Sequence, residues 1–249
     1  MSALVTLTGT EIRLLTREWA AMAFAFAFPP LFMLVLAGVF GNEADMAGTG
    51  VSGTDYYVAA YIGIPIGGLA LVGLPVMLAS YRERDVLRRF EAFGVPTGRV
   101  VAAQALVTAI LIVLAAGLVI AAAAPIYGVP AIEDPAGVAM AFISGTITMI
   151  VLGVVLGLAV PTARSAQALG MLVYMPMWLL GGGGPPPEVM SDPMRNISDV
   201  LPLWHSTSGI RESWLSGEGI ADHVLALGLW CAVGVAAITV LLRRRDARG

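Results

Sequence analysis

The chain has 249 residues, of which 58% are hydrophobic and only 12% are charged. A soluble globular domain carries roughly 25% charged residues, so this composition excludes a soluble enzyme or a disordered chain as the leading interpretation. The formal net charge of −3 leaves no basic excess for binding nucleic acid.

The cationic residues also exclude several kinds of site. All 14 of them are arginines, and a phosphate-binding loop needs a lysine to reach the nucleotide phosphates. The single Cys231 excludes an internal disulfide, and two histidines, His205 and His223, are too few for a His-rich metal centre. We therefore predict no catalytic residue, no metal site and no cofactor bound by this chain.

Long apolar stretches predict where the chain crosses a membrane. A helix needs about 20 residues to cross about 30 Å of hydrocarbon. Six stretches of roughly this length run over Ala20–Phe40, Tyr56–Ser80, Val100–Ala124, Gly137–Val160, Ala166–Leu180 and Val224–Leu242. The fifth is short, because Gly181–Gly184 and Pro185–Pro187 break the helix. Since helices satisfy their own backbone groups in lipid, the sequence predicts an all-α polytopic membrane protein with six transmembrane helices over residues 20–242, and one domain over residues 1–249.

The arginines predict the orientation of these six helices. With the N-terminus in the cytoplasm, 12 of the 14 arginines fall on the inner side, and 11 of the 17 acidic residues fall on the outer side. Inner loops of membrane proteins are enriched in arginine and lysine. We therefore predict a cell-membrane protein with both termini in the cytoplasm and with residues 243–249 as a cytoplasmic tail.

The interior of the predicted bundle is uncharged, since no Asp, Glu, Arg or Lys lies in the middle of a span. Ion-coupled carriers usually keep such a group, so this absence argues against one. Ser144-Gly145 is the nearest pattern to a nucleophile, but a helix-packing role is favoured, as it is for Gly63, Gly67, Gly68, Gly153 and Gly157. Prolines that interrupt or bound the spans fit either packing geometry or functional bends: Pro29, Pro30, Pro65, Pro75, Pro161 and Pro176.

Two amphipathic segments flank the first two spans. Residues 1–19 place Leu4, Val5, Ile12, Leu15 and Trp19 within about 100° of arc, which predicts an interfacial helix, with a plain cytoplasmic lead-in as the alternative. In the inner loop after the second span, Val86, Leu87, Phe90 and Phe93 recur at helical spacing, and the expected ion pairs are Asp85–Arg89 and Arg88–Glu91. Gly94 and Pro96 end this second helix. It fits either insertion into a cytoplasmic partner or a simple topology anchor.

Two sequence blocks, taken with this topology, resemble the membrane subunit of an ABC-2 type exporter over nearly the whole chain. The first block is Glu83-Arg84-Asp85-Val86-Leu87-Arg88-Arg89, followed by Gly94-Val95-Pro96 and Arg99. The second block comprises Glu188, Met190, Pro193, Ile197-Ser198, Leu201-Pro202-Leu203 and Ile210-Arg211-Glu212-Ser213-Trp214. The chain departs from the family pattern at Asp85-Val86, where Gly-Thr is frequent, and in the Gly- and Pro-rich run at 181–187.

This resemblance implies partners and site residues. Such subunits pair with a second copy or a close homologue and with two P-loop ATPase subunits, which bind the ATP and Mg. The resemblance implies an ATPase contact through Arg82, Glu83, Arg84, Asp85, Arg88, Arg89, Phe90 and Phe93. It also implies short re-entrant extracellular helices within residues 181–219, with an extracellular gate region at Met190, Pro202, Trp204 and Trp214. Residues Trp204, His205 and Trp214 are expected at the outer interface, as aromatic-belt residues more than as substrate contacts.

We therefore expect a transport subunit, not an enzyme, that exports an apolar or amphipathic compound such as a drug, antibiotic or lipid. The alternative is a non-transporting polytopic membrane protein, namely a receptor, an anchor or an immunity factor. An intramembrane enzyme is disfavoured, because the necessary catalytic groups are missing from the predicted spans.

Overall fold

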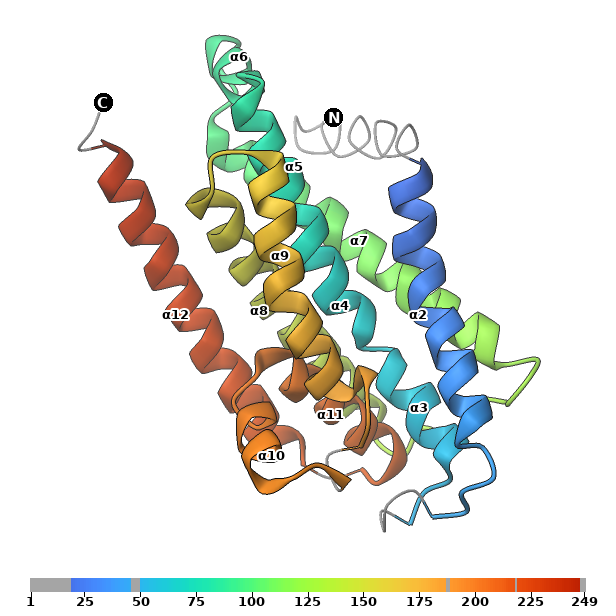
Figure 1. Ribbon diagram of the computed structural model, residues 1–249. Coiled ribbons are helices and arrows are strands. Elements are labelled where there is room, and N and C mark those ends of the chain that lie inside the picture. Colours follow the sequence, from blue (N-terminus) through green and yellow to red (C-terminus); the bar gives the residue numbers. More distant parts are fainter. Residues whose placement is uncertain (1–18, 46–49, 187–188, 218, 247–249) are drawn as a thin grey trace.

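The computed structural model describes residues 19–45, 50–186, 189–217 and 219–246, and over these ranges its regular elements are all helical. The long helices form an elongated bundle with α6 at one end and α10 and α11 at the opposite end (Figure 1). The predicted interfacial helix over residues 1–19 lies outside the described part, except that Trp19 begins α2.

The first two predicted spans differ in regularity. Helix α2 (Trp19–Val39) is continuous through Pro29 and Pro30. The second span is a series of helical pieces: α3 (Gly53–Tyr61), α4 (Ile64–Gly68), the π-helical η2 (Leu69–Gly73) and α5 (Leu74–Glu83). Its two irregularities lie just before Pro65 and Pro75, as expected for a residue without a backbone N–H.

The remaining helices follow in the predicted order. They are α6 (Val86–Ala92), α7 (Thr97–Ala123), α8 (Pro135–Ala159), α9 (Ala163–Trp178), η3 (Leu179–Gly183), α10 (Asp192–Ser198), α11 (Pro202–Leu215) and α12 (Ile220–Asp246). The predicted break after the fifth span is confirmed, because Gly181 and Gly182 leave the helical region and Gly182 has φ +93°. Helix α12 continues to Asp246, so Arg243, the first residue of the predicted tail, is helical.

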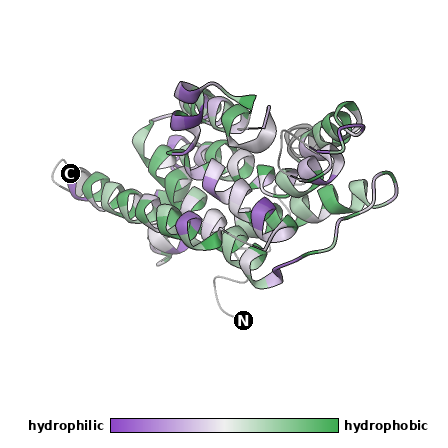
Figure 2. Cartoon of the chain, turned by 90° about the horizontal axis from the view of Figure 1, so that it is seen from below, coloured by the Kyte–Doolittle hydropathy of each residue, from purple (hydrophilic) through white to green (hydrophobic). Residues whose placement is uncertain are grey.

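Within the described ranges, four helical segments are long and apolar enough to cross a membrane: Gly53–Glu83, Thr97–Ala123, Pro135–Ala159 and Ile220–Arg243. Helix α2 has 21 residues, none of them charged, and its apolar stretch includes Phe26–Val39, whereas α9 has 16 residues. Figure 2 shows α12 as hydrophobic along most of its length, and its exposed side chains Leu225, Leu229 and Val233 recur every four residues. Helix α12 is therefore built to face hydrocarbon.

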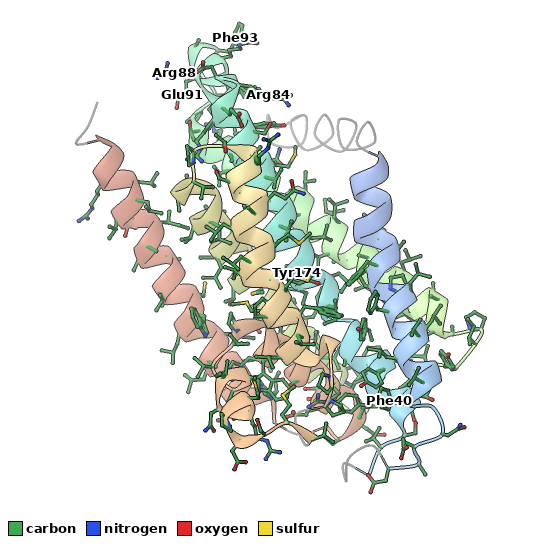
Figure 3. The ribbon with its side chains drawn as sticks, viewed as in Figure 1. Phe40, Arg84, Arg88, Glu91, Phe93 and Tyr174 are labelled. Carbon is green, nitrogen blue, oxygen red and sulfur yellow. The ribbon has the colours of Figure 1, made fainter. Side chains whose placement is uncertain are left out.

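Glycines allow close helix contacts inside the bundle, as the sequence predicted. Gly153 of α8 lies against the backbone carbonyl of Ala70 in η2, where no Cβ would fit. A Cβ on Gly67 would come within 2.8 Å of the Tyr174 ring, which lies in the middle of the bundle (Figure 3). The Ser144 hydroxyl donates to the carbonyl of Met140 one turn back in α8, at 2.6 Å, which fits its packing role.

Candidate functional site

Helix α6 is the most prominent feature at one end of the bundle. Figure 1 shows it beyond the ends of the long helices, on the side where α2 begins and α12 ends. It packs on α5 and α7 through its half-buried face, which carries Val86, Leu87 and Phe90. Phe93 follows the helix with 85% of its surface exposed and lies at the tip of this hairpin (Figure 3). Of the two predicted phenylalanines, Phe93 alone is presented fully to the surroundings.

The turn into α6 explains a departure from the family pattern. Asp85 lies between α5 and α6 with φ +53°, in the left-handed region. Glycine adopts this conformation without strain, and Asp tolerates it better than most other residues. Asp85 therefore maintains a turn that a glycine at this place would also allow. Gly94, with φ +78°, ends the hairpin as predicted.

The charges on α6 are arranged differently from the predicted pairs. The ion pair that forms is Asp85 Oδ1 with Arg88 Nε, at 3.7 Å, and both side chains are exposed. Neither Asp85–Arg89 nor Arg88–Glu91 is among the ion pairs of the described residues, so those pairings were wrong. Glu91 instead accepts a hydrogen bond from the Thr97 hydroxyl at the start of α7. This bond ties α6 to α7, and the side chains of Arg88 and Arg89 are exposed.

Two of the predicted contact residues face the bundle. The guanidinium of Arg82 donates to the carbonyls of Gly157, Leu158 and Val160 at the end of α8, with the Leu158 bond at 3.1 Å. The carboxylate of Glu83 accepts from the backbone N–H of Ala163, the first residue of α9, at 3.0 Å. The structure thus separates Arg82 and Glu83 from Arg84, Asp85, Arg88, Arg89, Phe90 and Phe93, which lie on or beside α6.

The predicted gate residues lie at the opposite end. Pro202 begins α11, Met190 lies before α10, and Trp204 and Trp214 are ten residues apart on α11, or about 15 Å along the helix. Both tryptophans are buried by protein, with exposed fractions of 8% and 4%. Trp214 Nε1 donates to the carbonyl of Pro130 at 3.0 Å. They therefore pack inside the protein and do not form an aromatic belt toward lipid headgroups.

A buried polar chain beside Trp204 was missed by the sequence analysis. Arg211, which is 6% exposed, donates to the Tyr56 hydroxyl at 2.6 Å and to Glu212 Oε1 at 3.1 Å. Glu212 Oε2 lies 3.1 Å from His223 Nε2, and His223 Nδ1 lies 3.1 Å from His205 Nδ1. The Arg211-Glu212 dipeptide in the outer segment was the available signal, but the contact between the two histidines depends on the packing of α11 against α12.

The protein environment shifts the pKa values of two of these groups, His205 and Glu212. Burial lowers the pKa of His205 below its usual 6.5, and the neighbouring His223 lowers it further. Burial alone would raise the pKa of Glu212, but hydrogen bonds and charge from His223 and Arg211 bring it below its usual 4.5. Among the described residues, no group of three or more His, Cys, Asp or Glu side chains could hold a metal ion. The chain of contacts is therefore a network of hydrogen bonds and charges.

Long apolar helices and an all-helical bundle define a multi-pass membrane protein. The sequence model of the ABC-2 type transporter family matches residues 2–215. The chain therefore belongs to the ABC-2 type transporter family, whose membrane subunits are permeases. Comparisons with curated proteins and with solved structures found no match.

Proposed function

We propose that this chain is the permease subunit of an ABC-2 type exporter and that it crosses the cell membrane six times. Two copies, or one copy with a close homologue, pair with two P-loop ATPase subunits in the cytoplasm. In this arrangement α6 and both termini are cytoplasmic, and α10 and α11 lie on the outer side. The excess of arginine on the α6 side supports this orientation.

The exposed tip of α6 is the observation that carries the proposal. Phe93 has 85% of its surface exposed at the end of a projecting hairpin, and covering its ring with a partner would remove apolar surface from water, which is favourable. Arg84 and Arg88 lie on the same projecting hairpin, below the Phe93 tip (Figure 3). An apolar anchor on a hairpin that also carries exposed arginines suits a protein pocket with an acidic rim. In an ABC exporter that pocket belongs to the ATPase subunit, whose closure on ATP and Mg would move α6.

The chemical class of the cargo is inferred from the uncharged interior of the bundle. The middle of each predicted span carries no charged residue, so a charged cargo would find no side chain to replace its lost water. We therefore propose an apolar or amphipathic cargo, such as a drug, an antibiotic or a lipid. It would leave between the two membrane halves near α10 and α11, where Met190, Pro202, Trp204 and Trp214 lie.

Substitution at the tip of α6 tests this function. Phe93→Ala should weaken binding of the partner ATPase by about tenfold or more, the usual effect of truncating an aromatic anchor, and should abolish transport of an amphipathic fluorescent dye in vesicles. Phe90→Ala should have a smaller effect on binding, because Phe90 is half-buried against the bundle. Val200→Ala, an exposed apolar residue at the opposite end, is the matched control. Unchanged transport with Phe93→Ala would refute the docking role of α6.

Labelling tests the orientation independently. Phe93→Cys in a Cys231→Ser background gives one reactive thiol at the α6 tip. We expect a membrane-impermeant maleimide to label it in inside-out vesicles and not in intact cells. Labelling in intact cells would place α6 outside and would overturn the proposed topology.

A further inference from the structure

The Arg82-Glu83 dipeptide holds the connection between α8 and α9 at both of its ends. Helix α8 ends at Ala159, and its cap residue Val160 is extended. The last four carbonyls of a helix lack partners within it, and Arg82 donates to the carbonyls of Gly157, Leu158 and Val160. A cation at this position also interacts favourably with the helix dipole. Arg82 is thus the cap of α8, although it is supplied by α5.

Glu83 caps the start of the next helix, α9. Ala163 is the first residue of α9, and its N–H has no partner inside the helix. Glu83 accepts from this N–H at 3.0 Å, and a carboxylate is favourable at a helix N-terminus. Thr162 and Ser165 complete the start of α9 with a capping box. Adjacent residues of α5 therefore bind the end of one helix and the start of the next.

This dipeptide also lies directly beside the α6 turn. Only Arg84 and Asp85 separate Glu83 from the first residue of α6. Because this link is so short, a displacement of α6 also moves the end of α5. The two bound helices reach the opposite end of the bundle: Gly145 of α8 lies against Ser206 of α11. The segment after α9 is tied to α11 by the Thr207 hydroxyl, which donates to the Gly181 carbonyl at 2.6 Å.

We propose that Arg82 and Glu83 are positioning residues that form an internal clamp, and that their role is not contact with the ATPase. The clamp joins the α5–α6 turn to the α8–α9 connection, so that movement of α6 is passed to α8 and α9 and through them to α11. This inference rests on the proposed function, because it assigns to two of the expected contact residues a role in transmission. Binding of the ATPase is left to Phe93 and the exposed arginines of α6.

The chain offers substitutions that separate these two roles. Glu83→Ala removes the acceptor, whereas Glu83→Gln removes the charge but keeps an oxygen that can accept from Ala163. Ala163→Pro removes the donor from the other side. Proline is favoured at the first position of a helix, and the preceding Thr162, at φ −125° and ψ 156°, already has the extended conformation that proline requires.

The measurement uses the complete chain with its ATPase in vesicles and compares ATPase affinity with dye transported per ATP hydrolysed. Glu83→Ala and Ala163→Pro should keep the affinity within about twofold and lower the transport ratio by about fivefold, since the lost hydrogen bond to a charged group is exposed. Glu83→Gln should keep both within about twofold. Hydrogen exchange over residues 158–166 should rise in the first two variants only.

The outcomes separate the clamp from the proposed function. If the unaltered chain binds no ATPase, the proposed function fails. If Glu83→Gln and Glu83→Ala both weaken ATPase binding by about tenfold or more, Glu83 is a charged contact with the partner and the clamp is overturned. Normal transport with Ala163→Pro would also overturn the clamp, while leaving the docking role of α6 intact. Arg88→Ala, on the exposed face of α6, is the control that should weaken ATPase binding.

Discussion

At the α6 end of the bundle, Arg82 and Glu83 bind backbone groups of α8 and α9, whereas at the α11 end Arg211 binds the side chains of Tyr56 and Glu212. The first site is partly exposed, so water can replace a lost bond. The second site is buried, so the loss of a bond there leaves a charged or polar group that water cannot reach. The two ends therefore differ in the cost of rearrangement.

This difference suits opposite roles in transport. Exposed or half-buried bonds to helix termini have a small net free energy, so a substitution can weaken the clamp without unfolding the bundle. A buried charge network is costly to break, because each partner alone is left desolvated. We therefore expect the α6 end to be sensitive in transport assays and the α11 end to be sensitive in stability assays.

The largest effect on stability is expected from Glu212→Ala. It leaves the buried guanidinium of Arg211 without its anion, which we expect to lower the free energy of unfolding by about 3 kcal/mol. Arg211→Met should cost less, about 1 kcal/mol, because it removes the buried charge itself and leaves Glu212 with His223. Chemical unfolding in detergent micelles gives both values. The exposed Glu43→Ala is the control, and a larger cost for Arg211→Met would contradict the network as described.

The second prediction concerns the turn at the α6 end. Asp85→Val should destabilise α6 by about 1–2 kcal/mol, because a β-branched residue is strained at φ +53°. Asp85→Gly should stay within about 0.5 kcal/mol of the unaltered chain, since relief of backbone strain offsets the loss of an exposed ion pair. Hydrogen exchange over residues 84–96 measures this local stability. Equal exchange in both variants would show that the turn is not strained.

Much of this architecture could be predicted from local sequence. The apolar stretches predicted the long helices, Gly181–Gly184 predicted the break after the fifth stretch, and the spacing of Val86, Leu87 and Phe90 predicted α6. Each of these features depends on residues close together in the chain. Hydrophobic periodicity and helix-breaking residues are signals of this kind.

The long-range bonds could not be predicted in the same way. Arg82 binds backbone carbonyls about 75 positions away. Every residue has a backbone carbonyl, so the residue types in the sequence do not indicate which carbonyls Arg82 binds. The burial of α11 was missed because its polar residues indicate solvent. In the structure, Ser206 and Thr207 instead donate to carbonyls of their own helix, which makes them compatible with burial.

Smaller effects on stability are expected from removing one hydrogen bond at the α11 end and one at the α6 end. Trp214→Phe leaves the Pro130 carbonyl unpaired beside a buried ring and should cost about 1 kcal/mol. Thr97→Val removes the exposed bond to Glu91 and should cost less than about 0.5 kcal/mol, since water replaces it. Thermal unfolding in the same detergent measures both. Equal losses would show that burial does not distinguish the two ends.

The smallest effect is a dependence on pH that belongs to the α11 end. Because the pKa of His205 is lowered on folding, the folded state disfavours its proton, and stability falls as the pH drops below 6.5. Glu212, whose pKa is also lowered, adds a further loss only below about pH 4.5. The groups that face His205 are His223 on α12, Glu212 on α11 and Asp199 just before α11. His205→Asn keeps a polar partner for His223 and should reduce the fall in the thermal unfolding temperature between pH 7.5 and pH 5.5. Phe93→Ala should leave this dependence on pH unchanged. An equal slope in all three proteins would mean that the acid response arises elsewhere in the chain.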